Sequence, residues 1–147
     1  MGKKLEFGKI YKITSLKSGR IYVGSTTDLL TKRYNSHKSG YMTYRECVIG
    51  GKYCTSYEIF ADDYPELPEI TLIERYPCKK LIELHSREAY HILTSNCVNH
   101  YVPVRSNWRA ILEGMRENEL DKTTLDELAR KDPLRSTVDP DKIIDIF

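Results

Sequence analysis

Two residues that can bind and cleave a phosphate ester stand close together in the first third of the chain. Arg33 and His37 are four residues apart, so on a helix their side chains lie beside each other. A guanidinium offers paired donors to phosphate oxygens and stabilises charge that grows in a transition state. An imidazole orients water or a hydroxyl group, or passes a proton. The alternative interpretation of this pair is an exposed basic helix face.

Two tyrosines precede this pair on what reads as a β-hairpin. Tyr11 and Tyr22 fall on its two strands, and a register that pairs them directly or diagonally places both rings on one face of the sheet. An unperturbed phenol, with a pKa of about 10, is a poor base at neutral pH. A catalytic tyrosine would therefore need positive charge nearby, from Arg33 or from a bound metal. Otherwise, tyrosines on strands are half-buried packing residues.

Glu88 is the most informative single position. In a helix over residues 78–95 this carboxylate falls inside the apolar arc. Burying it without a partner would be costly, so the sequence predicts compensation. A divalent cation is one candidate, and an arginine such as Arg87 or Arg75 is the other.

Taken in order along the chain, these residues resemble the GIY-YIG nuclease family. Lys9-Ile10-Tyr11 and Tyr22-Val23-Gly24 are similar to the two tripeptides that name the family, and the second tyrosine follows the first by eleven residues. The resemblance covers about residues 8–103. Lys9 replaces the first glycine of the family pattern, and Val23 replaces an isoleucine. The first departure bears on how substrate approaches, whereas the second is conservative.

The resemblance implies a metal-dependent endonuclease that hydrolyses DNA phosphodiester bonds by attack of water. It implies Tyr11 as the general base, Arg33 on the scissile phosphate and Glu88 as the metal ligand. A single carboxylate suits one Mg²⁺ (or Mn²⁺) that keeps part of its hydration shell, whereas a two-metal site needs more acidic ligands. Gly24 would let substrate or the next helix approach the backbone closely. The residues assigned to catalysis are Tyr11, Tyr22, Arg33, His37, Glu88 and Asn99.

Rival functions stay open at this point. One is a nucleic-acid-binding module that keeps the fold and has lost cleavage, and another is a structural protein whose polar residues pack a small core. A zinc site at Cys47 and Cys54 is disfavoured because the chain has no C-x-x-C pair and no spacing typical of a tetrahedral site. A cysteine–histidine nucleophile is equally unsupported.

The charge distribution favours a polyanionic partner. Residues 1–60 carry eleven Lys/Arg and four Asp/Glu, a net charge of +7, whereas residues 61–103 carry −3 and residues 104–147 carry −2. A basic region confined to one part of a protein is the expected footprint of nucleic acid, although a solvated lysine-rich surface is the alternative, and the family resemblance implies DNA. The candidate DNA contacts are Lys9, Lys12, Arg20, Lys32 and Lys38.

Periodicity and turn residues predict the elements that position these side chains. Alternating residues predict a hairpin with strands over 8–14 and 20–24. Ser25 and Asp28 have the spacing of a capping box for the next helix, and Gly40 can close that helix in a left-handed cap. The remaining expected elements are a strand over 69–77, a helix over 78–95 and an extended piece over 97–102, while residues 41–68 are largely unassigned.

These elements predict one α/β (α+β) domain, since 147 residues leave little core for two. We expect a small, mainly antiparallel three-stranded sheet flanked by helices over residues 1–103, with a helical C-terminal extension over 104–147. No apolar run approaches the roughly 18 residues of a membrane span. The N-terminus lacks the apolar stretch of a secretory signal, and four irregularly spaced cysteines favour a reducing compartment, so we expect an intracellular protein, in cytoplasm or nucleus. The oligomeric state stays open.

Overall fold

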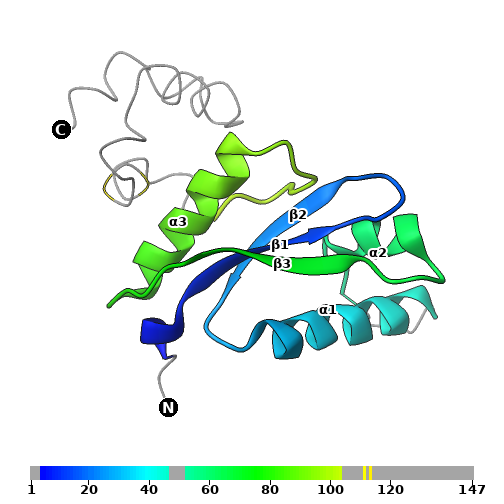
Figure 1. Ribbon diagram of the computed structural model, residues 1–147, viewed down its shortest axis with the longest axis horizontal. Helices are drawn as coiled ribbons and strands as arrows, with labels where there is room; N and C mark the ends of the chain where they lie inside the picture. Colours follow the sequence, from blue (N-terminus) through cyan, green and yellow to red (C-terminus); the bar gives the residue numbers. More distant parts are fainter. Residues whose placement is uncertain (1–3, 47–51, 104–110, 112, 114–147) are drawn as a thin grey trace.

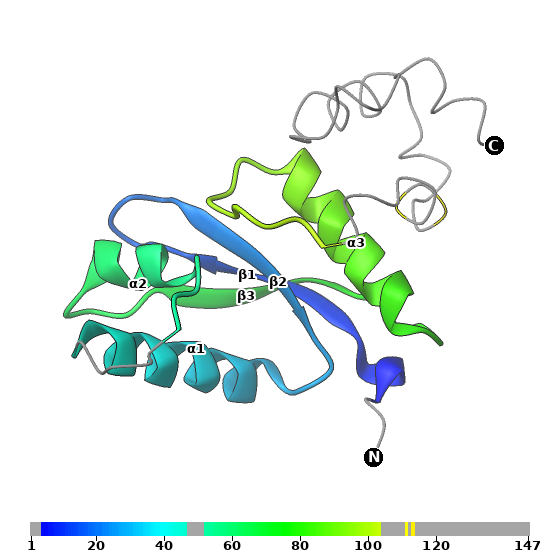
Figure 2. The same ribbon diagram turned by 180° about the vertical axis from the view of Figure 1, so that it is seen from behind.

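A three-stranded antiparallel sheet separates two layers of helices in the computed structural model (Figure 1), which describes residues 4–46, 52–103, 111 and 113. In space the strands follow the order β2-β1-β3, so β1 is central and β2 forms an edge. Helices α1 and α2 lie on one side of the sheet and α3 on the other (Figures 1 and 2). In chain order the elements are η1 (Leu5–Phe7), β1 (Lys9–Thr14), β2 (Ile21–Thr26), α1 (Leu30–Arg45), α2 (Tyr57–Asp63), β3 (Glu69–Arg75) and α3 (Leu81–Thr94).

The alternation of side chains along β1 divides the interior into two clusters. Ile10 points toward α3 and packs with Val23 and Leu84. Tyr11 and Ile13 belong to the cluster formed with α1 and α2. Because successive strand residues face opposite sides, this short central strand contributes to both layers. The antiparallel α+β fold predicted from the sequence is confirmed.

The hairpin register places both tyrosines of the candidate site on one face. Tyr11 pairs with Gly24, and Tyr22 pairs with Ile13, so the two tyrosines are diagonal neighbours. Of the two registers that the sequence allowed, the diagonal one is observed. It leaves Gly24 directly opposite Tyr11.

The predicted boundaries of the first helix are wrong at both ends. Ser25 belongs to β2, α1 begins only at Leu30, and the N-cap position makes no side-chain hydrogen bond. Gly40 does not end the helix, because α1 continues to Arg45. A Cβ at Gly40 would lie 2.3 Å from the Tyr57 hydroxyl oxygen, so this glycine lets α2 pack closely against α1.

The unassigned segment 41–68 contains the end of α1 and the short helix α2. The Asp63 carboxylate at the end of α2 accepts hydrogen bonds from the Ser15 hydroxyl (2.6 Å) and the backbone N–H of Leu16 (2.8 Å). These bonds tie α2 to the loop between β1 and β2. They arise from residues far apart in the sequence, which explains why no local pattern revealed the helix.

The second long helix is shorter than predicted. It spans Leu81–Thr94, and the Glu83 carboxylate accepts the backbone N–H groups of Lys79 and Lys80 at its start (2.8 and 2.9 Å). The third strand likewise ends at Arg75 rather than at residue 77. Both differences involve only the element ends, which a sequence pattern defines poorly.

The predicted extension over 104–147 lies outside the described residues, apart from Ile111 and Glu113. Ile111 is fully buried in the cluster that packs β1 and β2 against α3. In the part of the chain that the structure describes, no helix is long and apolar enough to cross a membrane.

Candidate active site

Four of the predicted catalytic residues line a single pocket of about 330 Å³. Tyr11 and Tyr22 come from the hairpin, Arg33 from the first turns of α1 and Glu88 from the middle of α3. The pocket therefore lies at the edge formed by β2, where the layers on the two sides of the sheet meet. Edge position leaves Tyr22, Arg33 and Glu88 partly exposed, whereas Tyr11 is fully buried in the wall of the pocket.

A hydrogen-bond chain leads from this pocket into the protein. Arg33 Nε donates to Tyr11 Oη (3.1 Å), and Tyr11 Oη lies 2.7 Å from His37 Nε2. His37 Nδ1 lies 2.8 Å from Ser56 Oγ. Because the tyrosine oxygen already accepts from Arg33, its own proton is available to His37 Nε2, and Nδ1 then carries the imidazole proton and donates to Ser56.

Burial sets the protonation states in this chain. His37 is only 4% exposed and does not line the pocket. Burial, and then the charge of Arg33, lower the His37 pKa to about 3, so the imidazole is neutral. Burial raises the Tyr11 pKa to about 12, although Arg33 opposes this shift. Burial raises the pKa of Tyr22 as well. Both phenols are therefore protonated at neutral pH.

Glu88 faces the pocket with little compensation for its charge. Ser25 Oγ donates to its Oε2 (2.8 Å), and this is the hydrogen bond of the carboxylate that the structure describes. Burial raises the Glu88 pKa to about 6, while Ser25 and Arg33 act in the opposite direction. Among the described residues, no lysine or arginine forms an ion pair with this carboxylate.

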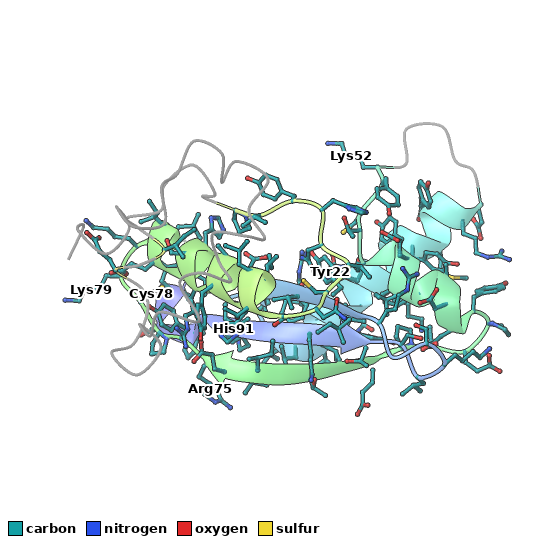
Figure 3. All side chains as sticks on the ribbon, turned by 90° about the horizontal axis from the view of Figure 1, so that it is seen from above. Tyr22, Lys52, Arg75, Cys78, Lys79 and His91 are labelled. Atoms are coloured by element: carbon teal, nitrogen blue, oxygen red, sulfur yellow. The ribbon has the colours of Figure 1, made fainter. Side chains whose placement is uncertain are left out.

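The arginines proposed as partners of Glu88 lie elsewhere. Arg87 is buried and forms an ion pair with Glu74 of β3, which also lies 2.7 Å from His91 Nε2. Arg75 is at the edge of the sheet opposite β2, and Figure 3 shows it pointing away from Tyr22. Neither of the two arginines named as partners of Glu88 therefore forms an ion pair with it, while Arg33, in the same pocket, lowers its pKa.

The donor set fits one hard cation. Among the described residues, no group of three or more His, Cys, Asp or Glu could chelate a metal. A closed site made only of protein ligands is therefore absent from that part of the chain. A half-buried carboxylate that opens on a pocket without an ion-pair partner is suited to Mg²⁺ or Mn²⁺, if phosphate oxygens and water complete the coordination.

Gly24 and Asn99 shape the pocket rather than lining it. A Cβ on Gly24 would lie 2.5 Å from Tyr11 Oη, so the glycine makes room for the Tyr11 ring. Asn99 accepts from the backbone N–H of Val23 (3.0 Å) and donates to its carbonyl (2.8 Å). This pair of bonds satisfies the outer side of β2 and holds the strand that carries Tyr22.

A model of the GIY-YIG catalytic domain matches residues 7–101. The chain belongs to the GIY-YIG family. This match covers more than half of the sequence and confirms the family that the paired tripeptides indicated. Comparisons with curated proteins and with solved structures found no match. GIY-YIG domains are nuclease domains, so the comparison assigns the chain to a family that acts on nucleic acid.

Two of the candidate DNA contacts of this GIY-YIG domain have partners within the protein. Lys9 is buried, and its ammonium donates to the backbone carbonyl of Asp28 (2.6 Å). Burial, with the nearby Arg75, lowers its pKa. Arg20 forms an ion pair with Asp62 (2.8 Å) on α2. The positive charges of Lys9 and Arg20 therefore contribute to contacts within the fold and are only partly available to DNA.

The other three candidate DNA contacts are more accessible. Lys32 is an exposed residue of α1 and lies 3.6 Å from an Asp28 carboxylate oxygen, a contact that contributes little when both groups are solvated. Lys38 lies on the same helix and Lys12 on β1, and both are partly exposed.

Sequence reasoning missed two residues of the GIY-YIG site. Ser25 was interpreted as a helix cap, yet its hydroxyl contacts Glu88. Ser56 is fully buried just before α2 and accepts from His37. Nothing in the local pattern marks Ser56, because its partner lies on another element.

Proposed function

We propose that this GIY-YIG protein is an endonuclease that hydrolyses DNA phosphodiester bonds by attack of water, with one Mg²⁺ or Mn²⁺ held by Glu88. The observation that carries the proposal is the shared pocket, in which a carboxylate without an ion pair faces a guanidinium and two phenols. The net charge of +7 in residues 1–60 supports DNA as the partner. We further propose that it acts inside the cell, where such DNA is found.

Arg33 is suited to bind the scissile phosphate. Its Nε is committed to Tyr11, whereas its two terminal nitrogens have no hydrogen bond to any residue that the structure describes. Those nitrogens can donate to two phosphate oxygens at once. The bond to Tyr11 fixes the plane of the guanidinium, so the donors stay oriented as charge grows on the phosphate.

Tyr11 is the residue we assign as general base. Its oxygen can accept a proton from water as its own proton passes to His37 Nε2, which lies 2.7 Å away. Ser56 accepts from the other imidazole nitrogen and keeps Nε2 ready to receive that proton. The transfer is unfavourable without a bound substrate, because burial sets the two pKa values far apart, at about 12 and about 3. A bound phosphate dianion or monoanion next to this chain would favour a cationic imidazole and narrow that gap.

Glu88 provides negative charge at the pocket. With a pKa of about 6 it is mostly ionised at neutral pH, and its position in a low-dielectric wall strengthens its attraction for a cation. When bound, the cation supplies positive charge to the phosphate and to the leaving oxygen. Ser25 keeps the carboxylate turned toward the pocket through its hydrogen bond to Oε2.

Cleavage of supercoiled plasmid tests the proposal. The wild-type protein should nick or linearise plasmid with Mg²⁺ or Mn²⁺ and stop when EDTA is added. Glu88→Gln keeps the size of the side chain and removes its charge, and we expect it to cleave at least about 100-fold more slowly, since even partners of a metal ligand are worth about 10- to 100-fold. Glu69→Gln, an exposed carboxylate on β3, is the matched control and should cleave as the wild type does.

Binding without cleavage by the wild-type protein would contradict the proposal. That result would favour the alternative, a nucleic-acid-binding module with the same fold and no nuclease activity. Thermal melting of both variants shows that any loss of cleavage does not come from unfolding.

A further inference from the structure

A second pocket, of about 250 Å³, lies on the other side of two residues of the candidate active site. Tyr22 and Glu88 belong to the walls of both pockets. The segment before α2 contributes Tyr53 and Thr55, and the segment after α3 contributes Tyr101. Figure 3 shows Tyr22 beside these two segments. We call this space the tyrosine pocket, after Tyr22, Tyr53 and Tyr101.

The tyrosine pocket presents exposed aromatic rings beside the proposed cleavage site. Tyr101 is 71% exposed and Tyr53 is 52% exposed. Tyr53 is held in place by a hydrogen bond from its hydroxyl to Glu58 (3.0 Å), and His100, the neighbour of Tyr101, lies 3.2 Å from the same carboxylate. The two segments are therefore linked. The Tyr53 ring also packs against the rings of Tyr44 and Tyr57, so Tyr101 is the more accessible ring for stacking.

The tyrosine pocket differs in charge from a third pocket that also adjoins the active-site pocket. In the described part of the chain, Glu88 is the one charged residue that lines the tyrosine pocket, so a phosphate group would find no cation there. A third pocket, of about 680 Å³, shares Thr27 and Asp28 with the active-site pocket and holds four cations in its walls. Three of those cations are exposed and suited to phosphate groups, namely Lys4, Lys32 and Arg75, whereas the fourth, Lys9, donates to the Asp28 carbonyl.

We infer that the tyrosine pocket binds an unstacked nucleobase of the nucleotide next to the scissile phosphate, so that the preferred substrate is DNA unpaired at the cleavage point. This inference rests on the proposed endonuclease function. Aromatic side chains stack on any base, because every base has a π face. In a regular duplex the base must first leave the stack, which costs free energy of unpairing and unstacking. In a bubble, a flap or a mismatch much of that free energy is not required, because the base is already unpaired.

Kinetics on two matched substrates test the inference. One is a fully paired labelled duplex, and the other has the same sequence with a short unpaired bubble. The wild-type protein should show a higher kcat/KM on the bubble. Tyr101→Ala should lower kcat/KM on the bubble by about 5- to 100-fold, the usual effect of losing one stacked base, and Tyr101→Phe should retain it. Leu16→Ala, an exposed apolar residue of the hairpin loop, is the control and should change nothing.

An abasic substrate makes the test specific for the base. Once the cleaved phosphate is mapped, each flanking nucleotide is replaced in turn by an abasic analogue. At one of these positions, removing the base should slow the wild-type protein by about the same factor as Tyr101→Ala slows cleavage of the intact bubble. At that position the Tyr101→Ala variant should cleave the abasic and intact substrates at the same rate. Equal rates of Tyr101→Ala and wild type on the intact bubble, or the same loss for Tyr101→Ala on the intact and abasic substrates, would overturn the inference.

Failure of the proposed function can be separated from failure of this inference. If the wild-type protein cleaves neither substrate, the endonuclease proposal fails, and fluorescence anisotropy then measures binding of the same bubble and duplex. A preference for the bubble that Tyr101→Ala abolishes would support base binding by the tyrosine pocket. Equal affinities of the wild type for both DNAs, or a preference that Tyr101→Ala leaves intact, would overturn it.

Discussion

Two neighbouring residues of α3, Arg87 and Glu88, carry opposite charges into opposite environments. Arg87 points toward β3, where Glu74 neutralises it and His91 completes the network. Glu88 points toward the edge of β2, where a single hydroxyl donates to it. The first charge is compensated within the fold by an ion pair, whereas the second has no ion pair with any lysine or arginine that the structure describes. Of the two, the carboxylate without an ion pair is the candidate for function.

The two sides of the sheet show the same contrast. The α3 side is an apolar cluster around Ile10 and Val23, beside which Arg87 forms its ion pair with Glu74. The α1 and α2 side contains aromatic rings joined by hydrogen bonds, with Tyr11 and His37 at its centre. The candidate active site lies at the edge strand where these two sides meet.

The largest expected effect on activity comes from the hydroxyl of Tyr11. Tyr11→Phe keeps the ring and its packing but removes the group that accepts from Arg33 and contacts His37. We expect single-turnover cleavage to fall by about 10²- to 10⁴-fold, the usual contribution of a general base. Tyr34→Phe, which removes the hydrogen bond from another α1-side phenol to the Pro68 carbonyl, is the control and should cleave normally. Cleavage by Tyr11→Phe at the wild-type rate would show that another group activates the water.

Breaking the compensated charge should affect stability instead. Arg87→Met leaves the Glu74 carboxylate without its main partner, and we expect about 3–5 kcal/mol of destabilisation in urea unfolding. The cleavage rate per folded molecule should stay near that of the wild type, measured at a temperature where the variant is folded. An Arg87→Met variant that is as stable as the wild type but inactive would reverse the roles assigned to Arg87 and Glu88.

Ser56→Ala probes the far end of the hydrogen-bond chain. The substitution removes the acceptor that sets the His37 tautomer, and we expect a loss of about 10- to 100-fold in kcat with little change in KM. Ser56→Thr keeps the hydroxyl and should recover part of the rate. A merely structural role would lower stability and leave the kcat of the folded protein unchanged.

The uncompensated carboxylate should also make activity depend on pH. Because burial raises the Glu88 pKa from its ordinary value of 4.5 to about 6, cleavage at low Mg²⁺ should fall about tenfold per pH unit below that value. Raising the Mg²⁺ concentration should move the midpoint to lower pH, since cation and proton compete for the carboxylate. A midpoint that is independent of Mg²⁺ would assign the titration to another group.

The smallest predicted effect is on stability without metal. A carboxyl group whose pKa is raised on folding destabilises the folded state above that pKa, and the penalty disappears as the pH falls below the unfolded value. For Glu88 the shift corresponds to about 2 kcal/mol at pH 7 to 8. Glu88→Gln should therefore unfold at a higher denaturant concentration than the wild type at pH 8 in EDTA, and at the same concentration near pH 4. Equal stability of Glu88→Gln and the wild type at both pH values would mean that the Glu88 carboxylate is already compensated.

The sequence predicted the features that depend on local periodicity. The hairpin, the third strand and α3 follow from alternating or helical spacing, and the family resemblance identified Tyr11, Arg33 and Glu88, which share one pocket in the fold. Errors arose where local and tertiary signals differ. The spacing of Ser25 and Asp28 imitates a capping box, but Ser25 is held in β2 by pairing with Ile10.

Other features depend on contacts that no local pattern contains. Ser56, just before α2, contacts His37 of α1, and the Asp63 carboxylate of α2 accepts a hydrogen bond from Ser15 in the hairpin loop. The exclusion of Arg87 as the partner of Glu88 required the position of α3 on the sheet, which directs Arg87 to Glu74.

The most direct test of the account is the position of a divalent ion in a complex with uncleaved DNA. A crystal of Tyr11→Phe with duplex or bubble DNA and Mn²⁺ would locate the ion by its anomalous scattering. The account predicts one ion that contacts the Glu88 carboxylate and an oxygen of the phosphate held by Arg33. An ion bound away from this pocket, with Glu88 still bonded only to Ser25, would contradict it.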